Sequence, residues 1–168
     1  EGVTIHLGES SLKETSDIEA YKCRFEGKYV FWCCDRFKVR DCYFAESARS
    51  SLWHSTDCEM TDCIVDAPKM FREMEGIKLR NVNMNCAQET FWSCSDIDLD
   101  NVFVTKADYI FMHCSNIKVN NLRLEGNYSF QHTRNVEIRN SDLQSKDALW
   151  ETENVTVYDS FINGEYLG

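Results

Sequence analysis

The sequence repeats with a period of about twenty residues, and this period restricts the fold more than any other feature. Each repeat contains one large apolar residue, which we call its anchor. The anchors are Leu12, Phe31, Leu52, Phe71, Phe91, Phe111, Phe130 and Leu149, which lie 19 to 21 residues apart. Apolar or small residues follow each anchor six and eight positions later, as Ile97 and Leu99 follow Phe91. A fixed repeat of this length predicts a solenoid, in which each repeat buries its apolar side against the next one.

Within each repeat, two short alternating segments are separated by a polar corner residue. The residue ten positions after the anchor is Asp41, Asp62, Asn81, Asn101, Asn121, Asn140 or Asp159, and Lys22 is the exception in the first repeat. A second corner precedes the first segment, at Asp17, Asp57, Gly76, Asp96, Asn116, Asn135 and Asn154, and Arg36 is the exception in this column. Asn and Asp accept left-handed backbone and therefore suit tight corners.

Three strands and three corners close one coil, which predicts an all-β fold: a right-handed parallel β-helix of about eight short turns of 19–21 residues. The single proline, Pro68, fits this fold because proline cannot donate a hydrogen bond to a β-ladder. We expect residues 1–168 to form one β-helix domain, or a fragment of a longer helix.

One outward column of charged residues offers a test of this stacking. Seven positions after the anchors, the residues are Glu19, Lys38, Glu59, Lys78, Asp98, Lys118, Glu137 and Thr156. The charges alternate in sign along the column, so each cation is expected between two carboxylates of neighbouring coils. Such cross-strand pairs contribute about 0.2–1 kcal/mol each and favour one register.

Composition limits the classes of partner. The net charge of −10 and the pI of about 4.8 argue against direct binding of nucleic acid, which requires a basic face. No apolar run reaches the length of about 18 residues that a membrane helix needs, and no signal segment opens the chain. We therefore expect no membrane association and a cytoplasmic location.

Nine cysteines are present, and they admit two interpretations. A disulfide framework is one of them, because stacked neighbours about 4.8 Å apart fall within the Cα range of disulfides. The favoured interpretation is that most cysteines fill small core positions. Cys23, Cys42 and Cys63, for example, share a column with Val82 and Val102. No C-x-x-C pair recurs, so no metal site and no cofactor are predicted.

Several strings resemble an uncharacterised bacterial family, domain of unknown function 3737. They are ESSLKE at 9–14, GKYVFW at 27–32, SLWHS at 51–55, GNYSFQ at 126–131, KDALW at 146–150 and NVTVYDSFINGEYLG at 154–168. The resemblance implies a single-stranded right-handed β-helix of the pectin-lyase-like kind. It implies no catalytic residue, because the family has no established activity.

The best candidate site is the pair of columns that follows the anchors. We predict that the following residues form a binding stripe: Trp32, Trp53, His54, Arg72, Trp92, His113, His132, Trp150 and Glu151. Exposed aromatic rings beside polar groups suit stacking on sugars or anchoring of a protein partner. The competing interpretation is an aromatic ladder that only stabilises the rod. His113, His132 and Glu151 fall on successive coils, but stacked neighbours point alike, so neither a metal site nor a catalytic site is predicted there.

A second outward column contains Tyr43, Ile64, Asn83 and Phe103, with Phe161 further along. Apolar side chains that face water in a row indicate a partner surface or the cover of a terminal segment. The sequence does not separate the two.

The sequence favours a non-catalytic structural or binding module that uses the aromatic stripe to bind a carbohydrate or a protein. Turns of 19–21 residues leave no room for the long loops on which catalytic sites are usually built. A carbohydrate-active enzyme of the polysaccharide lyase or glycoside hydrolase type is the alternative, by analogy of fold alone. An acidic DNA-mimic inhibitor is a further alternative, which the alternating charges disfavour. We also expect self-association into a homo-oligomer through uncapped helix ends.

Overall fold

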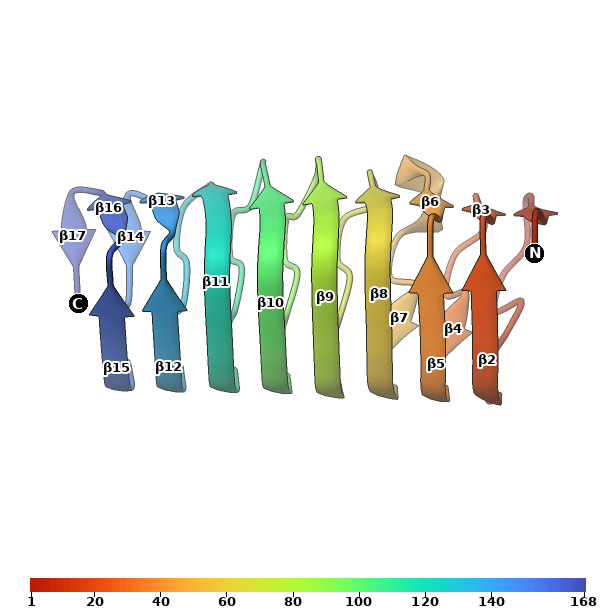
Figure 1. Ribbon diagram of the computed structural model, residues 1–168, viewed down its shortest axis with the longest axis horizontal. Coiled ribbons are helices and arrows are strands. Elements are labelled where there is room, and N and C mark those ends of the chain that lie inside the picture. The colour runs from red at the N-terminus through yellow and green to blue at the C-terminus, as the bar shows by residue number, and fades with distance from the viewer.

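The protein is a parallel β-solenoid whose successive coils lie side by side along a rod (Figure 1). The structure is a computed structural model and describes residues 1–168. Its elements are β1 (Thr4–Ile5), β2 (Ser16–Tyr21), β3 (Arg24–Phe25), β4 (Phe31–Trp32), β5 (Asp35–Arg40), β6 (Tyr43–Phe44), the 3₁₀ helix η1 (Glu46–Ala48), β7 (Leu52–Trp53), β8 (Thr56–Val65), β9 (Glu75–Met84), β10 (Ser95–Val104), β11 (Ser115–Glu125), β12 (Arg134–Arg139), β13 (Asp142–Gln144), β14 (Asp147–Ala148), β15 (Glu153–Tyr158), β16 (Phe161–Asn163) and β17 (Tyr166–Leu167). No helix in the structure has the length and apolar character required to cross a membrane.

Equivalent residues of neighbouring coils pair directly, as the period predicts. Ile97 pairs with Ile77 on one side and with Ile117 on the other, in parallel ladders of the main sheet. The predicted right-handed parallel β-helix is confirmed. It has about nine coils rather than eight, because β1 pairs with β3 and adds a partial coil before Leu12. We number the eight coils that contain anchors from one (Leu12) to eight (Leu149).

Left-handed backbone marks the corners of the coils. Every residue of the two predicted corner columns has a positive φ, including Lys22 (52°) and Arg36 (51°), which lack the favoured side chains. A further column, two residues after each anchor, was not predicted and is also left-handed, from Glu14 (56°) to Glu151 (49°). Because its members are Glu, Cys, Ser and His, the closure of the coil overrides local preference there.

The anchors form the centre of the core. The side chains of Phe71, Phe91, Phe111 and Phe130 are fully buried and stack face to face. Their ring centroids are 4.8, 4.7 and 4.4 Å apart, close to the spacing of parallel strands. One apolar cluster therefore runs along the rod, as expected for a solenoid.

The cysteines are free, and seven of the nine are buried. Burial raises the pKa of the Cys58 thiol and keeps it neutral. Several of these side chains also have a role beyond filling space, which the sequence did not reveal. The Sγ of Cys42 accepts a hydrogen bond from the backbone N–H of Cys23 at 3.3 Å, and the Oγ of Ser160 does the same for Ser141 at 3.0 Å. Sulfur or hydroxyl acceptors thus replace a backbone carbonyl at corners where the strand is interrupted, between β2 and β3 and between β12 and β13.

The column of alternating charges is in register, as predicted. Glu59 lies 3.5 Å from Lys38 Nζ and 3.8 Å from Lys78 Nζ, so it is placed between the two cations. Asp98 also stacks on Lys78, but its carboxylate pairs with the Arg80 guanidinium at 2.7 Å instead.

Candidate functional site

The predicted aromatic stripe is a continuous outward column on one face of the rod. Backbone pairing connects Trp32 to Trp53, Trp53 to Arg72, Arg72 to Trp92, and Trp92 to Met112. All four tryptophans of the chain belong to this column, because Trp150 occupies the same position in coil eight. We call Trp32, Trp53, Arg72 and Trp92 the aromatic–cation ladder.

Arg72 lies between two indole rings. Its guanidinium carbon is 4.6 Å from the ring centroid of Trp53 and 5.0 Å from that of Trp92. Its Nη2 is 3.5 Å from the Glu89 carboxylate, which Lys69 also contacts at 3.1 Å, while its Nε is buried without a hydrogen-bond partner. Cation–π attraction on both faces therefore holds this side chain more than hydrogen bonding does.

The tryptophans at the start of the ladder are packed on each other. The rings of Trp32 and Trp53 lie 5.4 Å apart at 34°, and Tyr29 packs edge-on against Trp32 at 4.9 Å. The indole Nε1 of Trp53 donates a hydrogen bond to the carbonyl of Lys69 at 2.7 Å. The ring faces are thus turned along the rod toward neighbouring coils, and the ring edges remain partly exposed to solvent.

The histidines and glutamates of the stripe occupy the unpredicted left-handed column beside the ladder. His54 Nδ1 is 3.1 Å from Glu73, and His132 Nδ1 is 2.9 Å from Glu151. The rings of His113 and His132 stack at 4.7 Å and 8°. Stacked rings direct their nitrogens alike rather than toward one point, and no group of three or more His, Cys, Asp or Glu side chains is arranged to hold a metal ion.

The structure divides the predicted stripe into separate parts. His54 packs against Trp32, so Trp32, Trp53, His54, Arg72 and Trp92 form one cluster. A second cluster joins His113, His132 and Glu151. Trp150 is separate and 45% exposed, because Met112 and Gln131 interrupt the aromatic column before it.

Sequence reasoning missed the column two residues before the anchors. It supplies Tyr29, Lys69 and Glu89 to the ladder, and the stacked pair Tyr109 and Tyr128, whose centroids are 4.8 Å apart. The signal was a tyrosine repeated at one position of coils two, six and seven.

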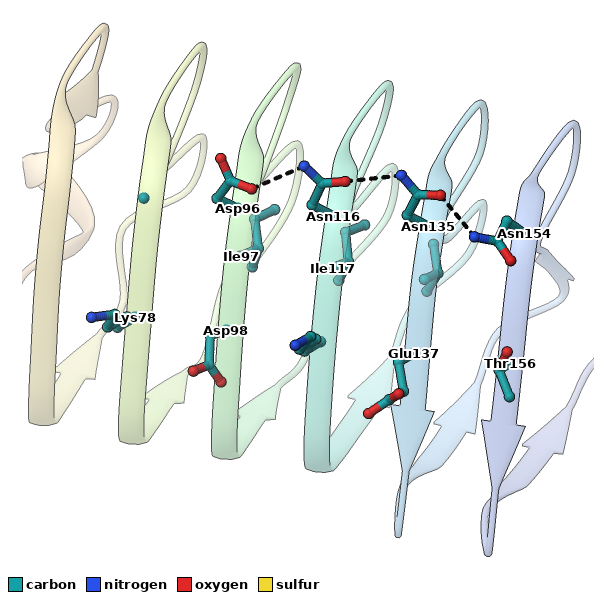
Figure 2. Close-up of a pocket in the computed structure, with 13 residues that line it drawn as sticks. Lys78, Asp96, Ile97, Asp98, Asn116, Ile117, Asn135, Glu137, Asn154 and Thr156 are labelled. Carbon is teal, nitrogen blue, oxygen red and sulfur yellow. Dashed lines mark hydrogen bonds between the residues drawn. The ribbon is translucent and has the colours of Figure 1, made fainter.

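The main sheet carries a second feature, a shallow groove of about 690 Å³. One side is the column of alternating charges, and the other is a ladder of amides at the corner (Figure 2). In this amide ladder Asn116 donates to Asp96 at 2.9 Å, Asn135 to Asn116 at 2.9 Å, and Asn154 to Asn135 at 2.8 Å.

The other outward column is also in register: Tyr43 pairs with Ile64, Ile64 with Asn83, and Asn83 with Phe103. Arginines at both ends lie over its aromatic rings: Arg24 is 4.4 Å from the Tyr43 ring, and Arg123 is 5.1 Å from that of Phe103.

These features define a β-solenoid repeat protein whose surface is organised in ladders of like side chains. The family model described as protein of unknown function (DUF3737) matches residues 1–168, and the chain belongs to this family. The resemblance inferred from the sequence strings is therefore confirmed, whereas the pectin-lyase-like kind of β-helix stays a prediction.

Two solved structures are similar over most of their length. One is QnrB1 in a trypsin-treated form, a plasmid-mediated fluoroquinolone resistance protein. Its sequence is 11% identical, the match covers 96% of this chain and 92% of that chain, and the TM-score is 0.34. The other is HetL from the cyanobacterium Nostoc sp. strain PCC 7120, a pentapeptide repeat protein involved in heterocyst differentiation regulation, with 10% identity, coverage of 95% and 86%, and a TM-score of 0.27. TM-scores this low do not bear on function. No curated protein matches the chain.

Proposed function

We propose that this protein is a non-catalytic binding module and that the aromatic–cation ladder is its docking surface for a partner protein. The observation that carries the proposal is the position of Arg72 between Trp53 and Trp92 on an outward face. Trp, Tyr and Arg are the residues most enriched among those that dominate binding energy at protein interfaces. Here they are held rigid before binding, which lowers the entropic cost of association.

A protein partner accounts for the ladder better than a sugar does. Stacking on a sugar requires an open aromatic face. In the ladder, the faces of Trp53 and Trp92 are turned toward Arg72, and Trp32 packs on Trp53. What remains available are ring edges and the flanking charges of Lys69 and Glu89, which suit a protein surface.

The other two functions considered receive less support. The His132–Glu151 pair lies in a row of stacked side chains, without a converging third group or a long loop over it, so a polysaccharide-cleaving site has no visible framework. The DNA-mimic alternative requires rows of uncompensated carboxylates. Glu59 instead lies between Lys38 and Lys78, which neutralise it.

We also propose that the protein works in the cytoplasm. The nine thiols are free, and seven are buried in the core, where the Sγ atoms of Cys42, Cys63 and Cys114 accept hydrogen bonds from backbone N–H groups. Such a core is compatible with a reducing compartment.

The test compares two double variants. The ladder variant carries Arg72→Ala and Trp92→Ala. The control variant carries Ile64→Ala and Phe161→Ala, which remove exposed apolar side chains from another face. Partners captured by the wild type from lysate of the native cell are purified, and their affinities are measured by calorimetry. Tryptophan fluorescence provides a second signal, because all four tryptophans lie in the stripe column. We expect the ladder variant to weaken binding at least about tenfold and the control to change it less than about twofold.

A partner that binds the ladder variant as tightly as the wild type would contradict the proposal. Binding on a glycan array that depends on Trp92 would favour the carbohydrate alternative. Release of reducing sugars or unsaturated uronates from a polysaccharide would favour the enzyme. Circular dichroism of each variant establishes that its fold is retained.

A further inference from the structure

The flat face of the main sheet carries two adjacent outward columns, seven and nine residues after the anchors, which we call the charged strip. From coil one to coil six its residues are Glu19 and Tyr21, Lys38 and Arg40, Glu59 and Thr61, Lys78 and Arg80, Asp98 and Asp100, and Lys118 and Asn120. The formal charges of these six coils are −1, +2, −1, +2, −2 and +1. The strip is thus slightly positive on a chain whose net charge is −10.

We infer that the charged strip is a docking surface for a second copy of this chain, turned end over end. Consider a two-fold axis that runs along the strands between coils three and four. Coil one then faces coil six of the partner, coil two faces coil five, and coil three faces coil four. Every facing pair has opposite charge, and the strongest pair sets Lys38 and Arg40 against Asp98 and Asp100. Such an interface is self-complementary, as two-fold symmetry requires.

The pattern also selects this orientation against the alternative. A two-fold axis along the rod would place each coil against the same coil of the partner, so that the +2 charge of coil two would meet an equal charge. Like charges brought together across an interface disfavour that arrangement. The alternation of charge therefore favours the antiparallel pairing and disfavours the parallel one.

The strip is available for such contacts. Strands β2, β5, β8, β9, β10 and β11, which carry the strip, lie side by side in the main sheet (Figure 1). Lys78 and Asp98 project in one row beside the groove, and Glu137 and Thr156 of coils seven and eight continue the row (Figure 2). The side chains of Lys38 and Lys78 are 61% and 60% exposed. Arg40 and Lys118 take part in none of the salt bridges within the chain, so their charges are free for a partner.

The area of the strip indicates a weak dimer. The sheet face that carries the strip spans about 20 Å along its six-residue strands and about 29 Å over six coils, or roughly 600 Å², and the strip itself covers about half of this area. Stable interfaces bury about 800 Å² on each partner. Because charge complementarity supplies the attraction, salt should weaken the dimer. The aromatic–cation ladder begins in a separate two-stranded sheet, β4 with β7, so both surfaces can be occupied together.

The test is a charge swap on the full chain, followed by sedimentation equilibrium. One variant carries Lys38→Glu and Arg40→Glu, and a second carries Asp98→Lys and Asp100→Lys. Each alone sets like charges against each other at both ends of the interface, so each should be monomeric at concentrations where the wild type dimerises. Mixed in equal amounts, the two variants should form a heterodimer. A control variant, Arg49→Glu with Lys106→Glu, changes the net charge as the first variant does but leaves the strip intact, and it should dimerise.

The wild-type dimer should weaken at least about tenfold between 50 and 500 mM NaCl, because opposite charges attract across the interface. Association that strengthens with salt would point to apolar contacts and overturn the inference. It would also be overturned by a wild type that stays monomeric at millimolar concentration in 50 mM NaCl, or by a mixture of variants that stays monomeric. If circular dichroism shows that either charge-swapped variant is misfolded, a milder variant with Lys38→Gln and Arg40→Gln replaces it. A dimer of this milder variant that is as stable as the wild-type dimer would then refute the proposal.

Discussion

Exchanging Asn116 for aspartate tests whether the amide ladder of the corner has a direction. In this ladder the amide of each asparagine donates to the residue of the preceding coil, and Asp96, at its start, only accepts (Figure 2). A carboxylate is therefore suited to position 96 and unsuited to position 116. Asn116→Asp removes the donor that faces Asp96 and places two carboxylates together, while both residues still tolerate the left-handed backbone at 55°.

The expected cost follows from three contributions. The lost hydrogen bond to a charged acceptor on an exposed corner costs about 1.5 kcal/mol. Repulsion of two carboxylates that relax to about 4 Å adds about 1 kcal/mol in water. The hydrogen bond that Asn135 donates becomes charge-assisted and returns about 0.5 kcal/mol. The sum is about 2 kcal/mol at pH 7, or a melting temperature about 4–8 °C lower.

The assay is urea unfolding of four proteins, followed by circular dichroism and tryptophan fluorescence. Asp96→Asn alone should change the free energy of unfolding by less than about 0.5 kcal/mol, because an amide oxygen still accepts from Asn116. The double variant should recover most of the cost, since an amide at position 96 can donate to the new carboxylate. The cost of Asn116→Asp should also shrink at acid pH, where protonation of one carboxyl removes the repulsion. A double variant as unstable as Asn116→Asp, at every pH, would refute a directional ladder.

Three further outcomes are expected. Phe91→Ala should lower the free energy of unfolding, measured in urea, by about 4 kcal/mol, because the ring is fully buried between two stacked neighbours. Phe91→Leu should lower it by only about 1 kcal/mol, since Leu52 occupies the same column. Equal losses for the two variants would contradict the role of the stack. The Arg36 guanidinium lowers the pKa of Asp17 below its ordinary value of 3.8. Their pairing therefore stabilises the fold above pH 3.8, and this stabilisation is lost as the pH falls through the lowered pKa. Arg36→Ala should lower the melting temperature at pH 7, and the difference from the wild type should disappear in strong acid. Ellman's reagent should label the exposed Cys33 first and all nine thiols only after unfolding, and a total below nine without reductant would indicate disulfides.

Much of the fold could be read from the sequence, because a solenoid repeats one local problem many times. Ile97 and Leu99 recur at the same offsets in other coils, so their stacking on Ile77 and Leu79 followed from the period alone. Even Arg36, an exception to the Asn and Asp residues of its column, has the same left-handed backbone as the other members of that column. Repetition averages out the ambiguity of any single residue.

What the sequence could not provide were contacts that depend on side-chain conformation. The column of Trp53, Arg72 and Trp92 was expected, but whether the arginine lies between the rings or extends into solvent depends on rotamers and on Glu89, which comes from another part of the coil. The left-handed corner at His54 was missed for a related reason. Its conformation is imposed by closure of the coil and not by the residue itself.

The alternating charge column has a consequence for how such a chain can change length. Loss of one whole coil, for example the one with Lys78, would bring Glu59 directly against Asp98 and create a repulsive pair. Loss of two consecutive coils would preserve the alternation. Insertions and deletions in relatives of this protein should therefore add or remove about forty residues at a time, because only a change of two coils keeps opposite charges on neighbouring coils.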